Sequence, residues 1–519
     1  MADMETIGTE ILVIGAGAAG IRAALAACQA GAQVTMVAKG ALTWSGSTFS
    51  SVSGGWGIQA LVGKERTEDN LEAFYDEIIR VGLGMCDPKL VRILVEESGP
   101  RFEDLISYGI KFRTDSQGAF VRTRGCFSDV KRAFVTEDLK NIQQSFQSIL
   151  GRSRVKMARG YLVDLIIADG RCWGGWAIMR GGRMVRINAK ATILANGGGA
   201  GIFQNHLVGE EEIGDGYALA YRAGGELENL EFVQFMLGLK ENHRRQFLAL
   251  PDLARPGILC DSEGGDLLET HIPDPQERAK AIDQRQSHAP FSSRDASCLV
   301  DIAVAKARQA GDKVLWRGNG RVHGQAEVLH FAHAFNGGVK INEMAGSTIP
   351  GLFATGEVAA GPHGADRVGG CMMTATQVFG RRAGESAVKR AKRLKVVSFP
   401  ECREENDIGW AKHMPKGNHT KNPLDIWLRV RKAMNKYAMV LRCGMGFEEC
   451  KRVLSGCDSQ LKEMKAKARV SPARYFETRN MILTGRLIAE SAEKRMESLG
   501  AHFREDSSEM RVRSVARGV

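Results

Sequence analysis

The clearest hydrophobic pattern lies near the start of the chain. A short run of aliphatic residues, Ile11–Ile14, is followed, after a few glycine and alanine positions, by Ile21–Ala30, a stretch composed mainly of Ala, Leu and Ile. The first pattern predicts a buried strand and the second predicts a helix, and Gln33–Val37 predicts another strand. A strand, a helix and a second strand in this order are typical of an α/β fold.

Further strands are predicted before residue 200. Val155–Ala168 and Cys172–Asn188 have the pattern of a β-hairpin, with glycine turn signals beside them. The apolar strand Ala191–Ala195 then runs directly into Asn196–Gly199, where three consecutive glycines allow the backbone to approach another group closely.

The pattern changes twice in the second half of the chain. Residues 227–325 are irregular and contain several prolines, which predicts an inserted domain. The strand and glycine character returns from Val328 to Gly384, and after Pro400 the chain is rich in Lys, Glu, Arg, Leu and Met. The helical spacing there is clearest at Ala473–Leu499.

The glycines after the first strand have the spacing G-x-G-x-x-G. Gly15 allows a tight turn, Gly17 lets the backbone approach a pyrophosphate, and Gly20 lets the helix pack close to the strand. The N-terminus of the helix offers unpaired N–H groups to a diphosphate. With a strand before it and a helix after it, this motif favours nucleotide binding over a plain glycine-rich turn.

The end of the second strand lacks the acid that usually binds the ribose hydroxyls in this motif. Ala38 and Lys39 stand there instead. Lys39 either lies near a phosphate of the nucleotide or is simply solvated, and the sequence slightly favours solvation.

A second glycine-rich segment, GLFATGEVAAGPHGADRVGG, begins at Gly351. It places a glycine-lined strand, the acid Glu357 and the cation Arg367 close together in the chain. Together with the first glycine motif, this segment indicates that two distant parts of the chain contact one nucleotide cofactor beside a charged reaction site. The combination predicts a redox enzyme.

Length and composition narrow the class of protein. A chain of 519 residues is expected to form two or three domains, and 44% hydrophobic with 25% charged residues is typical of a soluble globular protein. The N-terminal sequence MADMETIGTE has no signal-peptide pattern. The most membrane-like stretch, Ile11–Ala27, is interrupted by Arg22 and by glycines. We therefore expect a cytoplasmic chain with no direct membrane span.

Eleven cysteines are scattered along the chain with no C-x-x-C pair. This argues against a disulfide framework and against an iron–sulfur cluster or zinc site carried by the chain itself, so no metal ligands are predicted. Cys443, Cys450 and Cys457 recur every seven residues and would share one stripe of a helix. We expect them to be buried thiols that pack as small hydrophobic groups, although nearby glycines weaken the helix prediction.

The net charge of +11 is unevenly distributed. From Arg381 onward there are 31 Lys and Arg against 17 Asp and Glu, a balance of +14, so the preceding residues sum to about −3. This basic region is either a solvated surface, a docking site for an acidic partner, or a guide for an anionic substrate. Nucleic acid is a poor fit because no nucleic-acid motif is present.

Taken in order, the motifs resemble those of the succinate dehydrogenase, fumarate reductase and L-aspartate oxidase flavoprotein family. The matching segments are ILVIGAGAAG, Gly46–Ile58, Ala191–Gln204, Gly214–Phe235, Ser292–Val304, His333–Asn342, Pro350–Gly370 and Glu477–Asp506. The resemblance implies an α/β fold with a Rossmann-like FAD-binding domain, an inserted α+β capping domain and a C-terminal helical domain. The expected boundaries are 1–226 and 328–395 for the FAD-binding domain, 227–327 for the capping domain, and 396–519 for the helical domain.

The resemblance also implies which residues bind the cofactor. Gly15, Gly17, Ala18 and Gly20 would hold the pyrophosphate of FAD. The other expected cofactor residues are Lys39, Ser47, Thr48, Gly54, Gly55, Gly197, Asp215 and Glu357. Succinate dehydrogenases bond the flavin covalently to a His in the segment that matches Gly46–Ile58, and no His stands there. FAD is therefore expected to bind noncovalently.

Three further residues match catalytic positions of the family. His333 and Arg367 match the pair that holds a substrate carboxylate, and Arg294 matches the Arg that moves a proton to or from the substrate carbon. A fixed cationic pair stabilises the charge that develops when a hydride adds to a conjugated acid, and a positioned donor supplies the proton. Because a guanidinium group normally stays protonated, Arg294 needs a relay partner, which the sequence does not identify.

Two departures from the family change the expected substrate. Met236 stands where the family has a second substrate-binding His, and Gly257–Asp266 replaces the next family segment. This side of the site is then apolar and disfavours plain succinate or fumarate. Arg124, in the segment Thr123–Ser128, stands near the position of the Glu that reads the substrate ammonium in aspartate oxidases. A cation there would attract an anion and repel an amino group.

These observations support one main interpretation. The chain is expected to be an FAD-dependent oxidoreductase that acts on a C–C single or double bond next to a carboxyl or acyl group of a small molecule. It would exchange electrons with an iron–sulfur or ferredoxin-like subunit. One alternative is an amine or amino-acid oxidase resembling L-aspartate oxidase. Another is an FAD-carrying electron-transfer or assembly subunit that has lost its own substrate pocket.

Overall fold

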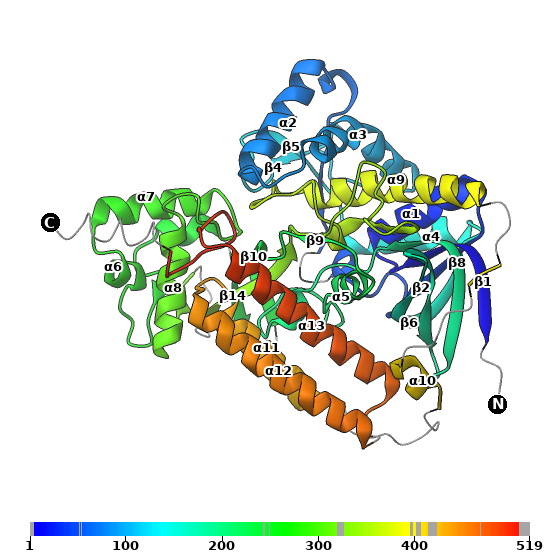
Figure 1. Ribbon diagram of the computed structural model, residues 1–519. Coiled ribbons are helices and arrows are strands. Elements are labelled where there is room, and N and C mark those ends of the chain that lie inside the picture. The colour runs from blue at the N-terminus through cyan, green and yellow to red at the C-terminus, as the bar shows by residue number, and fades with distance from the viewer. Residues whose placement is uncertain are drawn as a thin grey trace.

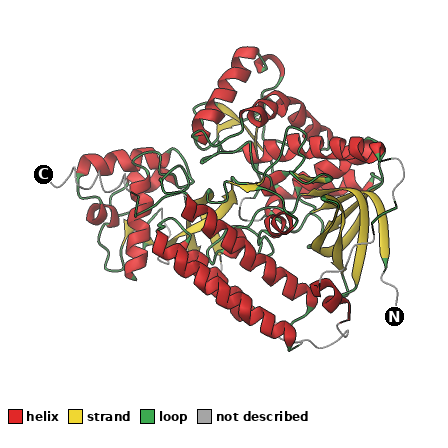
Figure 2. Cartoon of the chain, viewed as in Figure 1, coloured by secondary structure: helices red, strands yellow, loops and turns green. Residues whose placement is uncertain are grey.

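The computed structural model describes residues 5–507 except 51, 53, 242–243, 249, 319–325, 395–397, 401–405, 414–422 and 468. Figure 1 shows a sheet with covering helices, a smaller mixed lobe and a bundle of long helices. Figure 2 shows the strands of the main sheet gathered at one side and the long helices running beneath them.

The main sheet carries the N-terminal strand at its centre. Strand β1 pairs in parallel with both β2 and β8, and β8 pairs in parallel with β16. The strands are β1 (Thr6–Ile14), β2 (Val34–Ala38), β6 (Lys156–Ala168), β7 (Arg171–Met179), β8 (Met184–Leu194) and β16 (Leu352–Ala354). In register, Leu194 lies opposite both Ile14 and Ala354. The carboxyl ends of β1, β8 and β16 therefore meet at one edge, which is where α/β sheets bind ligands.

Residues 156–194 form three strands, as many as the pattern predicted, but the break between the second and the third lies earlier than expected. Strands β6, β7 and β8 pair successively in antiparallel order. The second predicted segment breaks at Gly181 and Gly182, which both have positive φ, 96° and 82°, and so make a turn that few other residues adopt.

Two helices cover this sheet closely. Figure 1 shows α1 (Ala18–Gln29) and α9 (Cys371–Arg393) side by side over the strands. A side chain at Gly384 would overlap the carbonyl oxygen of Ala23, so the two helix backbones approach each other only because this residue is glycine. The remaining elements of this part are α2 (Glu68–Gly82), α3 (Pro88–Ser107), α4 (Leu139–Gly151), α5 (Asp215–Arg222), β3 (Gly57–Gln59), β4 (Arg122–Arg124), β5 (Lys131–Val135), β9 (Leu227–Glu228), β15 (Gly338–Val339) and the short turns η1 (Ser47–Phe49), η2 (Gly63–Glu65), η3 (Ala200–Ile202) and η5 (Gly356–Val358).

The capping lobe has its own sheet and its own hydrophobic core. The strand order is β11-β10-β14-β13-β12, and the core includes Leu237, Leu259 and Val300. Its elements are β10 (Val233–Glu241), β11 (Arg244–Phe247), β12 (Leu259–Cys260), β13 (Leu315–Trp316), β14 (Ala326–Phe335), α6 (Leu267–His271), α7 (Pro275–Gln286), α8 (Cys298–Ala310) and η4 (Leu250–Ala254). Strand β14 crosses the boundary predicted at residue 327, because its pairing with β10 continues to Phe335.

The C-terminal part is helical, as predicted. It contains α10 (Asn406–His413), α11 (Leu424–Tyr437), α12 (Gly444–Ala466) and α13 (Pro472–Lys494). Despite its glycines, the segment after Cys443 is a helix. Two of these glycines lie in its first turn, where the first N–H groups have no partner within the helix and a glycine costs little stability. Cys450 and Cys457 are completely buried in the core, as expected for structural thiols. The cysteines that the structure describes are free thiols.

No helix within the described ranges is both long and apolar enough to cross a membrane. The same ranges contain no group of three or more His, Cys, Asp or Glu side chains arranged to hold a metal ion.

Candidate functional site

A cavity of about 400 Å³ lies where the carboxyl ends of β1, β8 and β16 meet the capping sheet. Its wall includes the glycine turn after β1, the turn after β8 at Asn196 and Gly197, and Glu357 after β16. Strands β10 and β14 of the cap close it with Met236 and His333. A concave site shared by two lobes is a common place for a bound small molecule.

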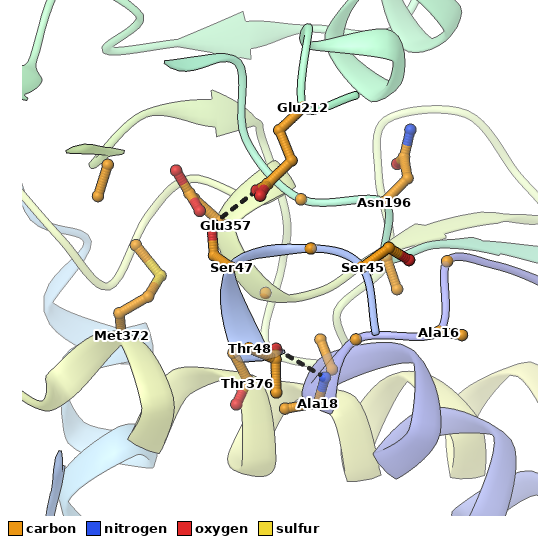
Figure 3. Close-up of a pocket in the computed structure, with 18 of the residues that line it drawn as sticks. Ala16, Ala18, Ser45, Ser47, Thr48, Asn196, Glu212, Glu357, Met372 and Thr376 are labelled. Carbon is orange, nitrogen blue, oxygen red and sulfur yellow. Dashed lines mark hydrogen bonds between the residues drawn. The ribbon is translucent and has the colours of Figure 1, made fainter. Parts of the chain in front are cut away.

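At one end of the cavity the backbone forms a cradle with no room for side chains. Gly15 has a φ of +108°, and a Cβ there would overlap the carbonyl oxygen of Ala195. A Cβ on Gly20 would overlap the carbonyl oxygen of Gly15, which explains why this buried glycine is needed although it does not line the cavity. The amide of Ala18 donates a hydrogen bond to Thr48 Oγ1 at 3.1 Å (Figure 3). Gly17, Ala18 and Thr48 all line the cavity.

Lys39 lines the cavity but is neither free in solvent nor unpaired. Its Nζ lies 2.8 Å from Asp215 Oδ2 and 3.4 Å from Glu477 Oε1. Burial alone would lower the pKa of Lys39, but these two carboxylates raise it above its usual value. Asp215 Oδ1 also accepts hydrogen bonds from Tyr161 Oη at 2.7 Å and Asn480 Nδ2 at 2.8 Å. The network fixes Asp215 at the cavity wall and balances the Lys39 charge within the protein.

Glutamates surround the middle of the cavity. Ser47 Oγ donates a hydrogen bond to Glu212 Oε2 at 2.7 Å, and the Phe335 amide donates one to Glu357 Oε1 at 3.0 Å. Figure 3 shows the carboxyl groups of Glu212 and Glu357 near each other, above Ser47. Glu212 and its neighbour Glu211 also line the cavity, and the sequence analysis identified neither. The fold of the loop after β8 brings both residues to the cavity wall, and no sequence pattern indicates this.

His333 and Arg367 come together at the end of the cavity nearest the cap. Arg367 is only 8% exposed, and its NH2 atom donates a hydrogen bond to Gln234 Oε1 at 2.6 Å. Burial, and then the charge of Arg367, lower the pKa of His333 to about 4, so the imidazole is neutral at neutral pH. The buried Arg367 Nε and His333 Nδ1 atoms find no hydrogen-bond partner within the described chain. Buried polar atoms without partners at a cavity are expected where a ligand supplies the missing bonds.

Arg294 does not line the cavity and is bonded to Asp366, the residue before Arg367. Its Nε donates a hydrogen bond to Asp366 Oδ2 at 2.8 Å, and its NH2 atom donates to the Val81 carbonyl at 2.5 Å. Asp366 is 1% exposed and also accepts a hydrogen bond from Ser292 Oγ at 2.6 Å, while its Oδ1 has no partner in the described structure. Burial raises the pKa of Asp366 to about 6, against the opposing effect of the Arg294 charge. Sequence reasoning missed Asp366, although it directly precedes Arg367.

Three apolar side chains form the cavity wall on the cap side. Met236, Phe247 and Pro290 line it, and the ring of Phe247 meets His333 edge-on at 5.5 Å between centroids. Cys126 lines the cavity nearby and accepts a hydrogen bond from the Ala289 amide at 3.4 Å.

Four predicted residues do not line the cavity: Gly20 and Arg294, described above, and Arg124 and Gly54. Arg124 is exposed on the short strand β4, and Gly54 is exposed one position before Gly55, which does line the cavity. Arg124 and its neighbour Thr123 are both exposed, whereas Cys126, in the loop that follows this strand, lines the cavity.

The residues at the cavity fit a dinucleotide cofactor. Gly15 lets the turn after β1 pack against Ala195, Gly20 lets helix α1 pack against that turn, and helix α1 therefore begins with its N-terminus at the cradle. The buried Asn196 Oδ1 finds no partner among the described residues, which leaves an acceptor for a cofactor donor.

Comparison with known proteins agrees with this geometry. Residues 10–373 match the family model of the FAD binding domain, and residues 427–514 match the C-terminal model of the fumarate reductase flavoprotein. One subunit of the fumarate reductase (CoM/CoB) of Methanothermobacter marburgensis is 28% identical, covering 98% of this chain and 96% of that protein. L-aspartate oxidase of Streptomyces coelicolor is 27% identical, covering 97% of this chain and 89% of that protein. A mutated form of Escherichia coli quinol fumarate reductase shares the fold, with a TM-score of 0.78, 22% identity and coverage of 97% and 92% of the two chains.

Proposed function

This chain belongs to the FAD-binding flavoprotein family of fumarate reductase, succinate dehydrogenase and L-aspartate oxidase, and on that premise we propose that it transfers a hydride at a carbon–carbon bond next to a carboxyl or acyl group. Membership makes it an FAD-dependent oxidoreductase of the class that acts on CH–CH groups. One observation carries the reaction type: His333 and Arg367 line the cavity that contains the nucleotide cradle, and each has a buried nitrogen with no partner in the part of the chain that the structure describes.

Arg367 and His333 bind and polarise the substrate carboxyl group. FAD, when bound, supplies or accepts the hydride. The Arg367 guanidinium and the neutral His333 imidazole donate hydrogen bonds to the carboxylate oxygens, where negative charge grows as a hydride reaches the conjugated double bond. Because Gln234 holds Arg367 in place, its N–H groups are oriented before the substrate arrives.

Arg294 and Asp366 move the proton. A hydride and a proton together saturate the double bond, and the reverse reaction removes both. Because Arg294 lies outside the cavity wall, its guanidinium has to turn toward the substrate carbon to exchange the proton there, and the buried Asp366 carboxyl, 2.8 Å from Arg294 Nε, restores or receives that proton. Asp366 therefore serves as the relay partner that the assignment of Arg294 requires.

Asp366→Asn is expected to lower kcat by about a hundredfold, because general acid–base groups contribute at least this much. With a pKa of about 6, Asp366 must be ionised to accept a proton, so the wild-type oxidation rate should rise as the pH passes 6, and the reduction rate should fall. Profiles of kcat against pH for both directions check this. The inflection should vanish in Asp366→Asn and persist in the matched control Asp295→Asn; an unchanged inflection in Asp366→Asn would exclude the relay.

The apolar wall selects the rest of the substrate. Met236, Phe247 and Pro290 offer no hydrogen bond to a second carboxylate, which would lose its hydration without compensation. An apolar tail would instead gain about 25 cal/mol per Å² of buried surface. The proposed substrate is therefore a monocarboxylic acid or acyl compound with an apolar end.

Met236→His is expected to raise kcat/KM for fumarate relative to crotonate by about tenfold, because an added donor can bond the second carboxylate. Crotonate carries a methyl group where fumarate carries that carboxylate, so the pair isolates the interaction. Steady-state kinetics with both acids, and with Met236→Leu as the apolar control, measure the ratio. A ratio that moves equally in both variants would show that Met236 does not contact this end of the substrate.

The cofactor is proposed to bind noncovalently, and electrons are proposed to pass to a separate iron–sulfur protein. Ser47, bonded to Glu212, stands in the segment where a linking His would be expected. No cluster site exists in the described chain, and the relative from Methanothermobacter is itself named as one subunit of its enzyme. The basic C-terminal region is a candidate docking surface for that iron–sulfur partner. The cytoplasmic location stays a prediction.

One experiment separates the three candidate functions. The holoenzyme is reduced chemically, and reoxidation of its flavin is followed by absorbance after addition of crotonate, fumarate, iminoaspartate, or a ferredoxin alone. Reoxidation by an enoic acid supports the proposed function. Reoxidation by iminoaspartate supports an aspartate oxidase, and reoxidation by ferredoxin alone supports an electron-transfer role.

A further inference from the structure

Two buried carboxyl groups in the cavity wall have no role in the proposed reaction. Glu212 is 6% exposed and accepts hydrogen bonds from Ser47 Oγ at 2.7 Å and from the Gly209 amide at 3.1 Å. Both donors hold the side chain in one orientation, so its position is built into the fold. Glu212 and Ser47 both line the cavity.

Glu357 approaches the same place from another element. A Cβ on Gly197 would lie 3.3 Å from Glu212 Oε2, and one on the next residue, Gly198, would overlap the Glu357 carboxyl. The two carboxyl groups therefore lie over consecutive glycines, and Figure 3 shows them near each other. Glycine at both positions leaves the room that this close approach requires.

The charges around the pair do not neutralise it. Glu211 lies beside Glu212 and adds a further negative charge, with its Oε1 bonded to the Gly46 amide at 3.1 Å. Tyr217 is uncharged at neutral pH and donates its hydroxyl to the Glu357 carbonyl at 3.1 Å. Arg367 attracts the Glu357 charge but forms its hydrogen bond with Gln234. No salt bridge within the described ranges includes Glu212 or Glu357.

Two buried carboxylates in this arrangement cannot both be ionised without large repulsion. Burial raises the pKa of Glu357 to about 7, and burial together with the Glu357 charge raises the pKa of Glu212 to about 8. The pair titrates as a unit and retains a proton at neutral pH. A protonated carboxyl differs from a carboxylate because it has an O–H to donate.

We propose that Glu212 and Glu357 share one proton and bind an oxygen of FAD through the protonated carboxyl, so that cofactor binding in alkaline solution, where the free pair has lost this proton, takes up a proton. Bound FAD displaces water from both carboxyl groups and brings a negatively charged diphosphate into the same cavity, and both effects favour the protonated form. Glu212 thus becomes a cofactor-binding residue beside Ser47 and Glu357. The proposal concerns the cofactor alone and does not depend on the substrate.

The sign of the pH effect follows from linkage. Bound FAD raises the affinity of the carboxyl pair for its proton. FAD therefore binds more tightly below the pKa of the free pair, and this added affinity for FAD is lost as the pH rises through the pKa of the FAD-bound pair. The dissociation constant for FAD should therefore increase through the range above pH 7, by at most about tenfold per pH unit for one proton.

The test is FAD binding by the flavin-stripped full chain, measured by quenching of flavin fluorescence from about pH 6 to 9, which brackets the two raised pKa values. Calorimetry in buffers of different ionisation enthalpy counts the protons taken up. The wild type should take up a proton and lose affinity with pH. Glu212→Gln, which mimics the neutral carboxyl, leaves only Glu357 to titrate, so its pH slope should move to lower pH, while the charge-matched control Glu211→Gln should keep the wild-type slope.

A second variant keeps the proposal testable if Glu212→Gln fails to fold. Ser47→Ala removes the donor that stabilises the Glu212 carboxylate, so the pH slope should move to higher pH. A wild-type dissociation constant that is independent of pH, with no proton uptake, would overturn the proposal. An unchanged slope in Glu212→Gln would also overturn it.

Discussion

Arg367→Gln is expected to lower kcat/KM by about a hundred- to a thousandfold, the usual loss when one oriented donor to a developing charge is removed. The residue lines the cavity, is buried, and has an Nε that finds no partner among the described residues, so its loss leaves the substrate carboxylate facing a neutral amide. Steady-state kinetics with the acid that reoxidises the wild-type flavin measure the change.

Flavin content separates this effect from a loss of the cofactor. Arg367→Gln should retain FAD, because the nucleotide cradle is formed by the turn after β1. Arg80→Gln, which removes an exposed cation paired with Asp129, serves as the control for charge and should keep wild-type turnover. Near-normal turnover by Arg367→Gln with full flavin content would contradict the assignment of the substrate site.

Gly15→Ala is expected to weaken FAD binding by about a hundredfold or more. The φ of +108° is strained for any residue with a side chain, and the new Cβ would overlap the Ala195 carbonyl, so the turn must shift. Strain and overlap together cost more than about 3 kcal/mol. The ratio of flavin to purified protein measures the loss, and acid denaturation of the wild type should release all its flavin if the cofactor is noncovalent.

Gly8→Ala provides the matched control for this prediction. Gly8 lies in the same strand, and a Cβ there meets no atom within 4 Å. It should therefore retain FAD and the wild-type melting temperature. If Gly15→Ala keeps a full complement of flavin, the turn after β1 is not the cofactor cradle.

Much of the fold follows from local patterns. The aliphatic run at Ile11–Ile14, the glycine spacing after it and the helix beyond it are visible in the sequence, because neighbouring residues alone satisfy these preferences. The helical spacing of Ala473–Leu499 likewise predicted α13. The helix after Cys443 was harder to predict, because packing of Cys450 and Cys457 in the core outweighs the low helix propensity of glycine there.

The candidate site likewise contains features that local sequence predicts and features that depend on tertiary packing. The sequence by itself determined the nucleotide cradle, the α/β class and, through its motifs, the candidate pair His333 and Arg367. Only the tertiary structure decided that Asp366 bonds Arg294, that Arg124 lies outside the cavity, and that Glu212 faces Glu357. Spacing along a chain reports the directions of nearby side chains, whereas the meeting of residues far apart depends on how strands, loops and lobes pack.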